Sequence, residues 1–171
     1  FPQNQHYFLM PKKRVTAEKS YYFDLPKLPI ALRRVKTDSE HRPSHQHDFT
    51  EKKHRHSFNE LVIVIRGRAM HWLEGHVFPI SAGDVFLLQK SQSHCFYDRQ
   101  DLELINIMYD AAQIVLPAEL RKLPGYCALF LVEPAYRQRR RFERRLHLQR
   151  TQLAGVEQIA GEMEKEYAEQ K

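Results

Sequence analysis

The residues whose types and spacing are best suited to chemistry are His54, His56 and Glu60, in the pattern His-x-His-x3-Glu. The apolar run 61–65 follows directly and leads to Gly67, which predicts a buried β-strand ending at a turn. Side chains alternate between the faces of a strand, so His54 and His56 point the same way. Glu60 shares that face if the register continues. Two imidazoles and a carboxylate on one surface predict a metal site or a polar ligand pocket.

A second motif follows further along the chain. Residues 79–83 contain a proline and a glycine and predict a turn, residues 84–88 form another apolar strand candidate, and His94 adds a third imidazole. Together the two motifs resemble the cupin superfamily, whose barrels carry His-x-His-x3-Glu first and a proline, a glycine and a histidine second. The resemblance implies a mainly β protein: a cupin-type antiparallel β-barrel (double-stranded β-helix, or jelly roll), here followed by a C-terminal α-helix.

The same resemblance implies metal ligands at His54, His56, Glu60 and His94. Three imidazoles and a carboxylate suit Zn, Ni, Fe or Mn. The alternative is a metal-free barrel in which these groups face a ligand directly, and both interpretations stay open. If a metal is bound, the purified protein carries it near stoichiometry and Glu60→Ala lowers its content.

Other histidines are predicted to have no part in the site. Residues 45–51 repeat the His-x-His-x3-Glu pattern, but Lys52, Lys53 and His54 follow instead of an apolar strand, so the later copy is favoured. Five histidines lack partners at useful spacing and are predicted to be exposed or satisfied: His6, His41, His71, His76 and His147.

Many short apolar segments with turn signals between them predict an antiparallel barrel or sandwich. Gly67 and the pair Glu74-Gly75 are expected to separate strands. Residues 127–132 are a strand or helix candidate. From Thr151, a candidate N-cap, apolar residues recur at helical spacing. The strand candidates are residues 21–23, 31–35, 61–66, 69–73, 76–80, 84–88, 94–97 and 104–109.

Composition is typical of one globular domain, with 42% hydrophobic and 28% charged residues in 171. No apolar run approaches the length of a membrane helix. Two cysteines make no disulfide framework, and free thiols in a cytoplasmic setting are expected. The net charge of +6 is concentrated in residues 137–145, predicted to be a solvated connecting segment and not a nucleic-acid contact. Because the chain begins with Phe1, it is expected to be a piece of a longer protein.

A closer resemblance concerns residues 56–64, 80–86, 93–94 and 101–109. These segments are similar to the sugar-responsive AraC-type transcription regulators, and most similar to the rhamnose-responsive members. The resemblance implies an N-terminal effector-binding cupin domain that binds a small molecule, often a sugar, and that forms a homodimer. DNA would be bound only through a separate C-terminal domain with two helix-turn-helix motifs, which these 171 residues do not contain.

A sugar pocket needs converging donors and acceptors and an aromatic face. The ligand-binding candidates are His54, His56, Glu60, His94, Trp72 and Phe96, with Phe86 and Tyr97 as other aromatic choices; no catalytic residue is predicted. Trp72 follows His71 on a predicted strand, so only one of the two points inward.

Three segments are predicted: an N-terminal arm (1–20), the barrel (21–132), and a linker with a helix behind the barrel or at the dimer interface (133–171). The competing hypothesis for function is a stand-alone metal-dependent cupin enzyme, such as a dioxygenase or a sugar isomerase.

Overall fold

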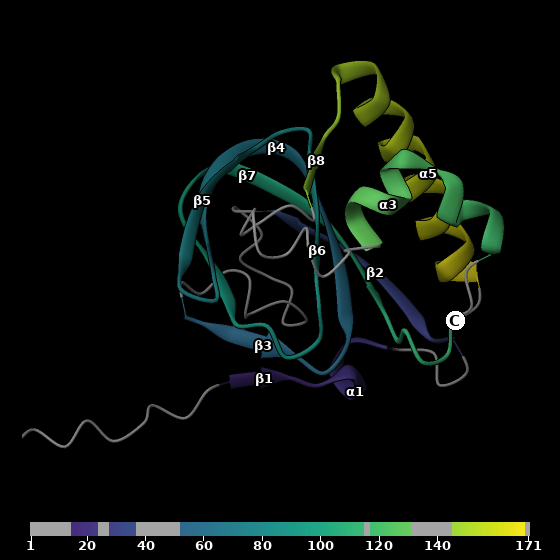
Figure 1. Ribbon diagram of the computed structural model, residues 1–171, viewed down its shortest axis with the longest axis horizontal. Coiled ribbons are helices and arrows are strands. Elements are labelled where there is room, and N and C mark those ends of the chain that lie inside the picture. The colour runs from purple at the N-terminus through teal and green to yellow at the C-terminus, as the bar shows by residue number, and fades with distance from the viewer. Residues whose placement is uncertain (1–14, 24–27, 37–51, 115–116, 131–144, 170–171) are drawn as a thin grey trace, which may run out of the picture.

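The computed structural model describes residues 15–23, 28–36, 52–114, 117–130 and 145–169. Its strands form one eight-stranded sheet that curves into a barrel, with two helices together on one side (Figure 1). The expected mainly β barrel followed by a C-terminal helix is confirmed. In order along the chain the strands are β1 (Val15–Ala17), β2 (Ile30–Lys36), β3 (His54–His56), β4 (Asn59–Leu73), β5 (His76–Ser81), β6 (Asp84–Leu88), β7 (His94–Tyr109) and β8 (Arg145–His147).

The sheet is built around the two longest strands, β4 and β7, which pair with each other antiparallel. On the main path the strands follow the order β1-β3-β7-β4-β6-β8, while β2 pairs with β7 and β5 with β4. Every described pairing is antiparallel except that of β1 with β3, which is parallel. The sheet is therefore mixed, and β1 lies within the range 1–20 that was expected to form the N-terminal arm.

Strand β4 is continuous where two strands were expected. Its pairing with β7 slips at three places between Val64 and Met70, which are irregularities of the β-bulge kind. Gly67 lies among them with φ +76°, a conformation that side chains other than glycine's rarely adopt. A Cβ there would approach the carbonyl oxygens of Gln100 and Asp101 to 2.3 Å. The glycine therefore bends the strand and does not end it.

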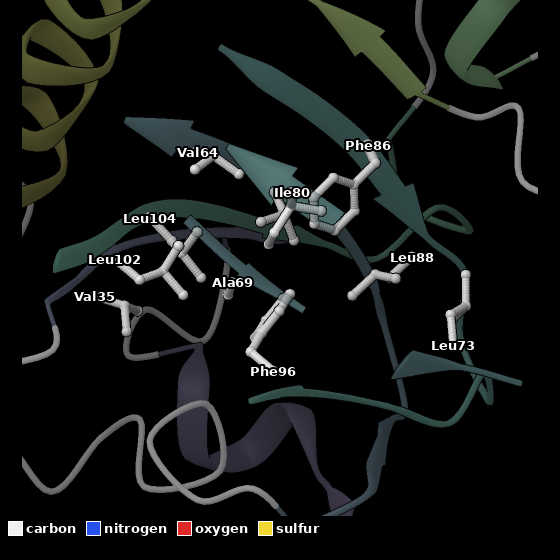
Figure 2. Packing of buried hydrophobic residues seen from close by; sticks show 11 residues of the cluster. Val35, Val64, Ala69, Leu73, Ile80, Phe86, Leu88, Phe96, Leu102 and Leu104 are labelled. Atoms are coloured by element: carbon white, nitrogen blue, oxygen red, sulfur yellow. The ribbon is translucent and has the colours of Figure 1, made fainter. Parts of the chain in front are cut away.

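The bulges change which residues face the barrel interior. Before them, the even-numbered Val62 and Val64 belong to the interior cluster; after them, the odd-numbered Ala69 and Leu73 do. Figure 2 shows side chains from several strands converging in this cluster. Its buried members are Val35, Val62, Val64, Ala69, Leu73, Ile80, Phe86, Leu88, Phe96, Leu102 and Leu104.

Among the described residues the sheet is accompanied by the helices α1 (Lys19–Tyr22), the 3-10 helix η2 (Ala118–Lys122), α3 (Pro124–Phe130) and α5 (Arg150–Glu169). The strand expected at 21–23 is wrong, because Tyr22 lies in α1 and packs its ring edge-on against Phe58. For residues 127–132 the helical alternative is the right one as far as Phe130. Thr151 is not an N-cap, because α5 already begins at Arg150.

Helix α5 covers the outer side of the sheet, beside α3 (Figure 1). Its apolar residues Leu153, Val156, Ala160 and Met163 join a second cluster that includes Ile63 of β4, together with Leu32, Val85, Ile105 and Leu129. A helix with one apolar stripe buries that stripe against the sheet and leaves its other faces in water. Ile159 is an exception on the exposed side, 58% accessible.

A buried ion pair joins β8 to the barrel. Asp84, which is fully buried, accepts from Nε of Arg145 (3.0 Å) and from the backbone N–H of Ser81 (2.7 Å). Nδ1 of His147 lies 2.9 Å from the same carboxylate. Of the charged run 137–145, only Arg145 lies among the described residues, and it is a structural contact and not merely solvated.

Cys95 and Cys127 are free thiols, as expected. Within the described ranges, no helix is both long and apolar enough to cross a membrane.

Candidate functional site

Three histidines from two strands meet inside the barrel. His54 and His56 lie on β3, and His94 begins β7 directly opposite His54. Their ring centroids lie 4.3 Å (His54 to His94), 4.9 Å (His56 to His94) and 5.1 Å (His54 to His56) apart. All three side chains are buried. The alternation rule predicted the shared face of His54 and His56, and the structure places His94, which the cupin resemblance implied as a further ligand, beside them.

The ring nitrogens of the three histidines converge. One donor atom from each histidine can be chosen so that all three lie within 4.8 Å of one another. Nε2 of His56 and Nε2 of His94 are 3.5 Å apart. The backbone fixes this arrangement: the N–H of Ser91 donates to the carbonyl of His56 (2.9 Å), and the N–H of Ser57 donates to that of Ala17 on β1 (3.1 Å).

Glu60, on β4, lies beside His56. Its Oε2 is 3.7 Å from Nδ1 of His56. The carboxylate is 1% exposed. Among the described residues, the group of mutually close donors consists of the three histidines and does not include Glu60. The structure therefore brings Glu60 next to the site but not to its centre.

An aromatic wall adjoins the cluster. The ring of Phe96, one of the ligand-binding candidates, meets His94 edge-on at 5.4 Å. His71, on β4, is fully buried between the rings of Phe86 and Phe96, each 4.8 Å away. His71 also meets His94 edge-on at 5.6 Å. It is a fourth buried imidazole that spacing along the sequence did not single out.

Trp72 is the candidate that the structure does not bring to the cluster. It is half-buried, and Nζ of Lys53 lies 3.7 Å from its ring centroid, a cation–π contact. His71 takes the inward position instead, because the bulges near Gly67 reverse which residues of β4 face inward. The sequence predicted only that one of His71 and Trp72 faces inward. It did not predict the bulge that decides which of them does so.

The remaining histidines lie away from this cluster or outside the described residues. His76 is exposed, and His147 contacts Asp84 on the other side of β6. The earlier His-x-His-x3-Glu copy at 45–51, together with His6 and His41, falls outside the described residues.

The donor set fits a first-row transition metal. Imidazole nitrogens bind Zn²⁺ at about 2.0–2.1 Å, so two of them at a tetrahedral centre lie about 3.3 Å apart. The 3.5 Å between Nε2 of His56 and Nε2 of His94 is close to that spacing. Three imidazoles leave positions for water or for a ligand with oxygen donors. Without a metal, the same cluster offers three polar rings in an apolar, buried setting.

A barrel with a buried histidine cluster and a helix on its outer face defines a cupin-type domain. Residues 34–157 match the family of AraC-like ligand binding domains, and the chain belongs to that family. The matched range includes the end of β2, all of β3 to β8 and the first part of α5. The barrel and the AraC-type resemblance expected from the sequence are thereby confirmed.

Curated relatives match part of the chain. An HTH-type transcriptional activator RhaR from Yersinia pseudotuberculosis is 41% identical over 78 residues, 46% of this chain and 26% of the relative. A protein of the same name from Pectobacterium carotovorum is 37% identical over 73 residues, 42% of this chain and 26% of the relative. The matched region thus spans about a quarter of each relative's length.

Solved structures are more distant. A putative mannose-6-phosphate isomerase from Ralstonia eutropha aligns with a TM-score of 0.40 at 16% identity, covering 51% of this chain and 80% of the other. The assignment of family therefore rests on the sequence relationships and not on this likeness.

Proposed function

We propose that this chain is the effector-sensing domain of an AraC-type transcription regulator. It binds a small ligand, a sugar, in the barrel and controls DNA binding or activation by a separate C-terminal helix-turn-helix domain. The observation that carries the proposal is the family membership of residues 34–157, which enclose the buried histidine cluster. The names of the relatives, transcriptional activators, support regulation over catalysis. A cytoplasmic setting and a homodimer with α5 near the contact belong to the same proposal.

The chemistry of the site suits a polyhydroxylated ligand. Sugar hydroxyls both donate and accept hydrogen bonds, and they require several polar groups held in fixed positions. His54, His56 and His94 supply such groups, and the rings of Phe96 and His71 supply an apolar surface beside them. A metal bound to the imidazoles would add an oxygen-binding position for a hydroxyl pair.

Sugar binding is expected to raise the midpoint of thermal unfolding. A ligand at one hundred times its dissociation constant stabilises the folded state by about 2.7 kcal/mol. The measurement is a panel of monosaccharides, including rhamnose, followed by thermal unfolding and by fluorescence of Trp72, the single tryptophan. His54→Ala should abolish the shift and the exposed-site variant His76→Ala should keep it. A panel in which no sugar moves the midpoint would contradict a sugar effector.

We further propose that the cluster holds one divalent ion, Zn, Ni, Fe or Mn. Chelator-free purification should yield about one equivalent per chain, because three neutral imidazoles form a sufficient donor set. His94→Ala should reduce the content to background, measured by mass spectrometry of the metal. His76→Ala is the matched control. Metal-free wild-type protein, or equal retention by His94→Ala, would refute metal binding.

A metal-dependent enzyme, such as a dioxygenase or sugar isomerase, is the second candidate, and the three-histidine cluster is the observation that favours it. The coding region beyond Lys171 discriminates between the two. Two helix-turn-helix units there support the regulator, whereas an early stop codon favours the enzyme.

A further inference from the structure

We propose that Glu60 positions the imidazole of His56 and does not itself bind the metal. The inference rests on the proposed metal at this site and concerns the residue that the cupin resemblance makes a fourth ligand. The proposal follows from the position of His56, whose ring contacts both His94 and Glu60. One ring nitrogen faces another histidine, and the other faces a carboxylate.

The two nitrogens of His56 have different neighbours. Nε2 lies 3.5 Å from Nε2 of His94, another member of the three-histidine group. Nδ1 lies 3.7 Å from Oε2 of Glu60, which is within ion-pair distance but longer than a hydrogen bond. An imidazole that gives Nε2 to a metal carries its proton on Nδ1, and a carboxylate on that side of the ring favours this tautomer. The carboxylate then fixes both the tautomer and the orientation of the ring.

The backbone on both sides of this contact is held in the sheet. Glu60 sits in β4 opposite Leu88 of β6 and Met108 of β7. The ring of His56 is stacked on Phe58, with centroids 4.9 Å apart and planes at 18°. His56 is therefore bounded by Phe58 on one face, by His94 at Nε2 and by Glu60 at Nδ1. Because both side chains are buried and well packed, the contact between Glu60 and His56 can hold the imidazole in one orientation.

A ligand role for Glu60 would require the carboxylate to reach the same centre as the three imidazoles. Its oxygens are not part of the group whose donors lie within 4.8 Å of one another. The carboxylate contacts Nδ1 of His56, whereas Nε2 of the same ring is the nitrogen near His94. The metal accordingly has three protein ligands, and its remaining positions are available to water or effector.

The test uses Co²⁺ as the probe metal in the whole chain, because its visible absorption reports the ligands around the ion. Glu60→Gln retains the shape and an acceptor oxygen for Nδ1. We expect it to bind one equivalent of Co²⁺ with the wild-type spectrum and with affinity lowered no more than about 10-fold, since outer-shell partners contribute 10–100-fold. Glu60→Ala, which lacks the acceptor, should keep the spectrum but lose about 100-fold.

His54→Ala provides the comparison for loss of a ligand, and its spectrum should change. Glu119→Gln, at an exposed position of η2, controls for the substitution itself. A spectral change in Glu60→Gln as large as that in His54→Ala would overturn the positioning role, as would an unchanged affinity in Glu60→Ala. A wild-type chain that binds no Co²⁺ would instead refute the metal site as a whole. Circular dichroism of each variant verifies that it is folded.

Discussion

Replacing Phe86 by alanine is expected to lower the free energy of unfolding by about 3–5 kcal/mol, the range for removing a buried aromatic ring. Phe86 is fully buried on β6 and belongs to the interior cluster shown in Figure 2. Its ring stacks on that of His71 with planes at 27°. The loss combines the transfer of the ring to water with the cavity left behind, which closely packed neighbours fill only in part.

Urea denaturation followed by circular dichroism measures this change. The matched control is Val77→Ala on β5, where the side chain is 44% exposed and the effect should stay within about 0.5 kcal/mol. Equal midpoints for the two variants would show that the barrel interior is not closely packed around Phe86.

Asp84→Asn is expected to lower the free energy of unfolding by about 3 kcal/mol, since removing one partner of a buried ion pair leaves the other uncompensated. The Arg145 side chain, 29% exposed, keeps its charge and loses its counter-ion. The backbone N–H of Ser81 also loses a charged acceptor. His147 contributes less, because its side chain is 61% exposed and solvent screens its interaction.

Denaturation again gives the magnitude, and amide hydrogen exchange gives the location. Exchange should accelerate at β8 and in the first turn of α5, because the backbone N–H of Leu148 is held by the carbonyl of Gly83 beside Asp84 (2.8 Å). Asp98→Asn, an exposed change on β7, should leave both measurements unaltered. If Asp84→Asn and Asp98→Asn behave alike, the ion pair does not hold β8 to the barrel.

Much of the barrel could be predicted from local patterns. Strand β6 has the expected bounds, and β2, β5 and α5 differ from expectation by one residue or a few. In each of these elements the apolar residues keep one spacing from end to end, so the residues of the buried face can be identified from the sequence. The shared face of His54 and His56 could be predicted for the same reason.

Two features lay beyond local patterns because they depend on partners distant in the sequence. Strand β1 exists through its parallel pairing with β3, about forty residues away, as in Thr16 with Arg55. The bulges near Gly67 come from the register between β4 and β7, and they place His71 inward and Trp72 outward. A third feature is local: Glu60 lies four residues after His56, but β3 ends at His56 and β4 begins at Asn59, so the alternation of faces could not be extended from one to the other.

Strand β6 pairs with β4 along one edge and with β8 along the other. Leu88, at its C-terminal end, pairs with Glu60 of β4, and Asp84, at its N-terminal end, pairs with His147 of β8, shortly before α5 begins. Five residues thus connect the carboxylate beside the histidines to the base of the outer helix. Close packing transmits displacement instead of absorbing it. The barrel interior and the base of the outer helix are therefore joined through five consecutive buried residues of a single strand.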